Sequence, residues 1–199
     1  MTTEEKPAGI WRNRSFVLLF SAQVVSLVGS GATTIGLALL AYGMAGASAA
    51  TVVVGTALTL RIVAFLAFSQ PAGVLADRAD RKTILIVADL LRAGLLLFLP
   101  FVSQVWHIYL LVFLLNAVTA FFTPTYEASV PAVVGEAHVV EALAVSRVAV
   151  DIEAVLAPTV AAAIVALVGA RWVFWFDAAS YLVSASFVAF PLVPRSTEA

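Results

Sequence analysis

Six ionisable side chains stand inside apolar stretches of this sequence, where a charge is hard to accommodate. They are Arg61, Asp89, Arg92, Asp151, Glu153 and Asp177. A charged side chain at the centre of a bilayer costs about 2.5–3.5 kcal/mol on insertion scales, so such groups are usually paired or functional. The set holds two cations and four carboxylates, so ion pairs among these residues leave at least two carboxylates without a cation partner. Ion pairing and proton binding are therefore the chemistry that these residues could support.

Residue spacing identifies two of the possible ion pairs. Asp89 and Arg92 are three residues apart, and Arg147 and Asp151 are four residues apart. Side chains three or four positions apart lie on the same face of a helix, so each pair can form within one helix. A purely structural role would account for both pairs, and a functional role stays open.

Arg61 and Glu153 are the deepest of the charges. They either form a buried pair or each face an aqueous cavity. Asp151 points away from Glu153, since two residues turn a helix by about 200°. A carboxylate without a cation partner in an apolar medium is a candidate proton carrier. We therefore expect Glu153 to couple proton movement, unless it is held in a static pair with Arg61. Asp177 is expected within reach of water, near the outer end of the last apolar stretch.

Small polar residues recur at helical spacing in two of the apolar stretches. One stripe holds Gln23, Ser26, Ser30 and Thr33, and a second holds Asn116, Thr119 and Thr123. Steps of three and four residues place each set on one helix face. Inside a membrane such a face packs closely against another helix or lines a water-filled cavity. The spacing alone fits both interpretations.

The composition places the whole chain in a lipid bilayer. Of its 199 residues 62% are apolar and 12% charged, whereas soluble domains hold about 45–50% and about 25%. Soluble enzymes, nucleic-acid binders and disordered segments are thereby excluded. The formal net charge of −1 gives no field that would attract nucleic acid. Cysteine is absent and the two histidines, His107 and His138, are far apart, so we expect no metal site, no cofactor and no enzyme activity.

Six membrane-spanning helices are predicted, because the long apolar runs lack the alternation of barrel strands. The uncharged runs 15–60 and 93–126 are each much longer than the about 20 residues of one crossing, so both must fold back. Glycines and small residues at 42–48 mark the first reversal, and 100–107 the second. The predicted spans are 16–42, 49–70, 84–101, 107–127, 141–168 and 172–192, the last ending at Pro191 and Pro194.

The basic residues set the expected orientation. With the N-terminus inside, the outer loops hold only Arg171. The cytoplasmic segments, with the cytoplasmic end of the fifth span, hold Lys6, Arg12, Arg14, Arg78, Arg81, Lys82, Arg147 and Arg195. This asymmetry follows the positive-inside rule. We expect a multi-pass protein of the cell membrane with both termini cytoplasmic. Residues 1–15 form the N-terminal tail and 16–193 the six-helix bundle.

A ten-residue segment between the second and third predicted spans carries a recognisable pattern. Residues 73–82 read Gly-Val-Leu-Ala-Asp-Arg-Ala-Asp-Arg-Lys. Position and spacing resemble the G-x-L-x-D-R-x-x-R-K signature of the major facilitator superfamily, with Asp80 where many members have glycine. Arg12-Asn13-Arg14-Ser15-Phe16, and Phe122-Thr123-Pro124 with Pro131, further resemble its drug and siderophore exporters of the enterobactin type. Ala157-Pro158 resembles the family's antiporter motif only in part, since alanines replace its glycines.

This resemblance implies an all-α fold and a conformational latch. The fold would be the N-terminal half of a facilitator, built from two inverted three-helix repeats, with 194–199 as the start of the central cytoplasmic loop. The latch would hold Gly73, Asp77, Arg78, Arg81 and Lys82. Asp77 would face a helix N-terminus in the other half, where the helix dipole favours an anion. Glu127, at the cytoplasmic end of the fourth span, is the expected partner of Arg81.

The resemblance also implies a function. The first and fourth helices of such a half line the substrate cavity, which makes Gln23 and Asn116 the expected substrate contacts. The chain would belong to an exporter of a small amphipathic molecule that works by alternating access and proton exchange. Its partners would be the lipid bilayer, the substrate, protons, and a C-terminal six-helix half or a second copy. The alternative is a membrane scaffold, or an inactive half-transporter, that moves nothing.

Overall fold

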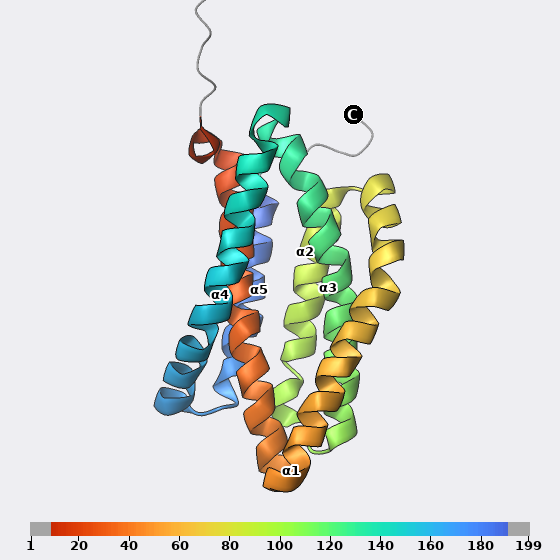
Figure 1. Cartoon of the computed structure of the whole chain (residues 1–199), viewed down its shortest axis with the longest axis vertical. Helices are drawn as coiled ribbons and strands as arrows, with labels where there is room; N and C mark the ends of the chain where they lie inside the picture. Colours follow the sequence, from red (N-terminus) through yellow and green to blue (C-terminus); the bar gives the residue numbers. More distant parts are fainter. Residues whose placement is uncertain (1–8, 191–199) are drawn as a thin grey trace, which may run out of the picture.

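The structure is a computed structural model that describes residues 9–190, and every regular element in this range is helical. The α-helices are α1 (Arg14–Arg78), α2 (Arg81–Leu96), α3 (Val105–Val134), α4 (Val139–Val168) and α5 (Trp172–Ala189). Short 3₁₀ helices precede or connect them at Ile10–Arg12, Leu99–Phe101 and Glu136–His138. Figure 1 shows the helices running up and down in one bundle.

Helix α1 contains two spans, because the chain reverses at Gly46. Gly46 has φ +73° and ψ 171°, a conformation essentially restricted to glycine. The reversal separates a first half of α1 (Arg14–Gly46) from a second half (Ser48–Arg78), which meet at one end of the bundle in Figure 1. Within 9–190, six helical segments are long and apolar enough to cross a membrane, so the predicted count and both predicted reversals are confirmed.

Several helices extend beyond their predicted bounds. The second half of α1 continues through Pro71 to Arg78, and α3 continues through Pro124 and Pro131 to Val134. The signature segment therefore forms the last turns of α1 and the first residues of α2, and only Ala79 and Asp80 connect the two helices. Pro191, Pro194 and the predicted loop start 194–199 lie outside the described residues, as do Lys6 and Arg195.

The six spans bring both described chain ends to the same end of the bundle (Figure 1). The first half of α1 packs against α4 and α5, and α3 packs against α1 and α2. The two larger apolar clusters of the interior lie toward opposite ends of the bundle: one near the Gly46 end includes Leu37, Leu96, Ile108 and Phe174, and one near the signature segment includes Phe16, Leu85, Phe122 and Val130. The buried charged residues Asp89, Arg92 and Asp177 lie on α2 and α5.

Replacing Gly46 tests whether the reversal depends on this backbone conformation. The Gly46→Ala variant should lose about 1–3 kcal/mol of stability from backbone strain alone, since a Cβ at this position meets nothing within 4 Å. Gly43→Ala is the matched control: Gly43 is helical and equally open, so alanine should be neutral or stabilise by up to about 1 kcal/mol. Thermal unfolding in detergent compares the two. Equal unfolding temperatures would contradict the role of Gly46.

Candidate functional site

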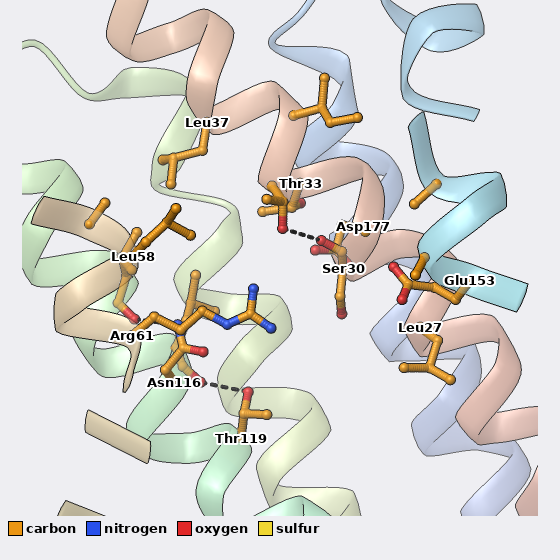
Figure 2. Close-up of a pocket in the computed structure, with 18 of the residues that line it drawn as sticks. Leu27, Ser30, Thr33, Leu37, Leu58, Arg61, Asn116, Thr119, Glu153 and Asp177 are labelled. Atoms are coloured by element: carbon orange, nitrogen blue, oxygen red, sulfur yellow. Dashed lines mark hydrogen bonds between the residues drawn. The ribbon is translucent and has the colours of Figure 1, made fainter. Parts of the chain in front are cut away.

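A cleft lined by apolar and polar side chains runs between both halves of α1, α3 and α4. It consists of two adjoining cavities of about 450 Å³ and about 720 Å³. The two share several lining residues and therefore form one continuous space; the shared residues are Leu27, Ser30, Arg61, Asn116, Thr119 and Val150. Figure 2 shows the smaller cavity, with Arg61 and Glu153 extending toward it from opposite walls.

All seven residues of the two polar stripes line this cleft, including the expected substrate contacts Gln23 and Asn116. The smaller cavity is lined by Ser30, Thr33, Asn116 and Thr119, and the larger one by Gln23, Ser26 and Thr123. Five of them donate to the backbone of their own helix, among them Ser30 Oγ to Ser26 O at 2.8 Å and Asn116 Nδ2 to Val112 O at 2.8 Å; the other three are Ser26, Thr119 and Thr123. These bonds satisfy polar hydrogens of the five side chains while the side chains still face the cleft.

Arg61 and Glu153 face the same cavity without forming an ion pair. Arg61 is exposed and Glu153 half-buried, and the structure records no contact within 4.0 Å between their charged atoms anywhere in the described range. Of the two arrangements that the sequence left open, the structure therefore has each charge facing the cavity. The Cβ that an alanine would have at Gly31 would overlap the Glu153 carboxylate, so this carboxylate lies directly on the backbone of α1.

The two pairs expected from spacing are both present, in very different surroundings. Arg92 forms an ion pair with Asp89 that is almost entirely buried. Arg147 and Asp151 are 4.0 Å apart, with side chains 77% and 68% exposed. Asp151 lines a shallow outer pocket of α4 with Val148 and Val155, away from the cleft, as its opposition to Glu153 predicts.

The buried pair is held by three helices. Ser184 Oγ of α5 donates to Asp89 Oδ2 at 2.6 Å. The Arg92 guanidinium lies between the rings of Phe122 of α3 and Tyr181 of α5, 4.2 Å from each ring centroid. A guanidinium over an aromatic face is attracted by the ring quadrupole. The pair thus joins α2 to both neighbouring helices.

Asp177 differs from its sequence prediction. It was expected within reach of water, but the structure buries it to 1% exposure at the wall of the smaller cavity. The cause is close packing: the Cβ that an alanine would have at Gly29 would overlap the Asp177 carboxylate and the Ser180 hydroxyl. A sequence signal existed, because Asp177, Ser180 and Ser184 are spaced by three and four residues, as in the stripes of the first and fourth spans.

The signature segment is bound to the neighbouring helices through Arg81. Its Nε donates to Ala76 O at 3.2 Å and its Nη1 to Ala128 O at 3.0 Å. The predicted Arg81–Glu127 ion pair is therefore wrong for this structure. The Glu127 side chain is exposed and lines the larger cavity.

The remaining residues of the segment face outward or start α2. Asp77 and Arg78 are exposed, and a Cβ at Gly73 would meet nothing within 4 Å. Lys82 lies half-buried in the first turn of α2. Asp80, where many facilitators have glycine, is the N-cap of α2: its Oδ2 accepts from Thr83 N at 3.2 Å.

Sequence reasoning missed a second connection at this end of the bundle. Asn13 Oδ1 accepts from Phe16 N at 3.2 Å and caps α1, while its Nδ2 donates to Val133 O at 2.7 Å in the last turn of α3. One side chain thus satisfies an orphan donor and an orphan acceptor of two helix ends. The sequence signal was an asparagine directly before an apolar helix.

Two substitutions at Asn13 separate these bonds. Asn13→Ala removes both and should cost about 1–3 kcal/mol, the sum of a lost N-cap and a lost hydrogen bond. Asn13→Ser keeps a capping oxygen but lacks the reach to Val133 O, so its loss should be smaller. Thermal unfolding in detergent measures both. Two variants with wild-type unfolding temperatures would show that neither bond stabilises the bundle.

A bundle of six spans with a charged cleft on one side has the architecture of half a major facilitator transporter. The chain belongs to the transmembrane secretion effector family of these transporters, whose family profile matches residues 7–195. It is therefore a multi-pass membrane protein of a transporter family, as its resemblance implied.

Individual relatives agree with this assignment. The chain is 26% identical over 196 residues to the uncharacterized MFS-type transporter YfiS of Bacillus subtilis, covering 96% of this chain and 45% of YfiS. It is 27% identical over 185 residues to macrolide efflux protein A of Streptococcus pyogenes, covering 90% and 45%. The chain thus spans a little under half the length of these curated relatives.

Proposed function

We propose that the chain is the N-terminal half of a secondary active exporter of small amphipathic molecules. The cleft between α1, α3 and α4 is the observation that carries this proposal. It would form one wall of a substrate site, and a C-terminal six-helix half, or a second copy, would form the other wall. Alternating access requires two bundles that rock around one site. Proton exchange would drive the movement.

The lining of the cleft suits an amphipathic molecule. Leu27, Leu58 and Val150 offer apolar contact, while Asn116 and Thr119 offer polar groups in the same cavity. Arg61 and Glu153 add opposite charges to the lining, and the two do not form an ion pair with each other. Ligand sites are typically lined by apolar side chains with a few polar groups that fix orientation.

The relatives support export as the direction. Macrolide efflux protein A carries its activity in its name, and the family is described as secretion effectors. The relatives' greater length fits a transporter whose second half supplies the opposite wall. The exposed Asp77 and Arg78 and the open position at Gly73 support a latch whose contacts lie in that other half.

A transport assay with two arms tests this proposal. Cells that express the chain alone should accumulate ethidium and a radiolabelled macrolide like control cells. Cells that also express the C-terminal half of macrolide efflux protein A should accumulate several-fold less of at least one compound. Asp77→Asn should reduce this difference, and Glu136→Gln, an exposed carboxylate outside the cleft, should not. Accumulation equal to control in both arms would favour the alternative, a membrane scaffold that moves nothing.

For the location we propose the cell membrane, with the signature segment on the cytoplasmic side. Arg12, Arg14, Arg81 and Lys82 support it, because they lie at the end of the bundle opposite Arg171. The sequence contains no cysteine, so single introduced thiols can be labelled without background.

The labelling experiment uses one exposed position at each end. Ser103→Cys, between α2 and α3, should react with a membrane-impermeant maleimide in intact cells. Glu136→Cys, in the 3₁₀ helix before α4, should react only after permeabilisation. The opposite pattern would reverse the proposed orientation.

A further inference from the structure

The smaller cavity holds one cation for two carboxylates. Among the described residues that line it, Arg61 is cationic, while Glu153 and Asp177 are acidic. Burying an ionised carboxylate is costly unless a cation or several hydrogen-bond donors compensate it. Arg61 projects from the second half of α1 into the cavity that Glu153 also faces (Figure 2). One of the two carboxylates therefore lacks a counter-charge of its own.

The surroundings of Asp177 make it the uncompensated group. Ser180 Oγ lies 3.2 Å from Asp177 Oδ1, and Thr33 lies beside the carboxyl group. The structure records no ion pair of Asp177 within 4.0 Å over residues 9–190. Glu153 is half-buried beside open space, whereas Asp177 is enclosed.

The charges on the helices packed against α5 do not supply the missing cation. The first half of α1 has no ionisable side chain between its first turn and Gly46, apart from the distant phenol of Tyr42. From α2 come Asp89 and Arg92, which neutralise each other in their own pair. From α4 comes Glu153, a second acid. The phenol of Tyr181, on α5 itself, hydrogen-bonds with Ser30 Oγ at 2.7 Å.

Asp177 also lies where a change of charge would move a helix. Its carboxylate and the Ser180 hydroxyl touch the backbone of α1 at Gly29, and Val173 touches it at Gly36. This contact leaves no space for a side chain at Gly29 between α1 and α5. An ionised Asp177 would need a cation or further hydrogen-bond donors, which the α1 backbone at Gly29 does not supply, whereas a neutral carboxyl group can stay there.

From this geometry we propose that Asp177 is a proton-binding site at the contact between α1 and α5. A proton from water in the cleft binds a carboxylate oxygen and converts the carboxylate into a carboxyl group. The contact with α1 is then closed, and return of the proton to water reopens it. Glu153 remains ionised opposite Arg61. The inference rests on the proposed proton coupling and replaces Glu153, the sequence-based candidate, as the proton carrier.

Infrared spectroscopy of the chain in lipid nanodiscs tests this site without any transport. Across a pH titration, the wild type should show the carbonyl-stretch band of a protonated, buried carboxyl group, which loses intensity as the pH rises. Asp177→Asn should remove this band completely. Glu153→Gln should retain it, and so should Glu136→Gln, which alters an exposed carboxylate. Carbon-13 labelling of aspartate in the unaltered chain should shift the band, which assigns it to an aspartate and excludes Glu153 even if Asp177→Asn fails to fold; Asp89→Asn should retain the band.

Three outcomes would overturn the proposal. The band could persist in Asp177→Asn, it could disappear in Glu153→Gln, or it could respond to sodium at constant pH, which would indicate an alkali-cation site. Absence of any such band would also overturn it. Failure of the proposed function can be told apart from this. If the Asp177 band is present but neither transport arm shows export, the proposed function is contradicted while the proton-binding site is supported.

Discussion

A charge inside an apolar bundle is stable only with a counter-charge, hydrogen-bond donors or water, and this requirement organises the interior of the protein. Arg92 and Asp89 meet it together, with Ser184 and two aromatic rings completing the enclosure. Arg61 and Glu153 meet it through the open cleft. Asp177 has hydrogen-bonding neighbours but no cation partner, so in our proposal its protonation depends on how α1 and α5 pack around it.

The first half of α1 contacts both Asp177 and Glu153. Gly29 lies on Asp177 and Gly31 lies on Glu153, so two acidic side chains approach the same helix from α5 and from α4. Ser30, between the two glycines, faces the cleft and bonds Tyr181. A small movement of this half of α1 would therefore change the cleft wall and the surroundings of both carboxylates together. Close packing of small residues makes such coupling possible, because the backbone itself is the contact surface.

Much of the fold could be predicted from the sequence, because an apolar chain with few charges permits few arrangements. Unbroken apolar runs predicted six spans, and the small residues near Gly46 predicted the first reversal. Spacing within one helix predicted the Asp89–Arg92 pair. Contacts between helices were harder to predict. The burial of Asp177 depends on Gly29, which is far away in sequence, and Arg81 donates to a backbone carbonyl, which no side-chain pattern reveals.

The reversal at Gly46 limits how much of the chain an antibody or a protease can reach at this end of the bundle. Two long spans are joined there almost without a connecting segment, and α4 and α5 are joined by only a few residues around Gly169. This end of the molecule therefore offers an antibody or a protease very little accessible chain. An epitope for antibody binding would best be inserted beside Ser103, in the longer connection between α2 and α3.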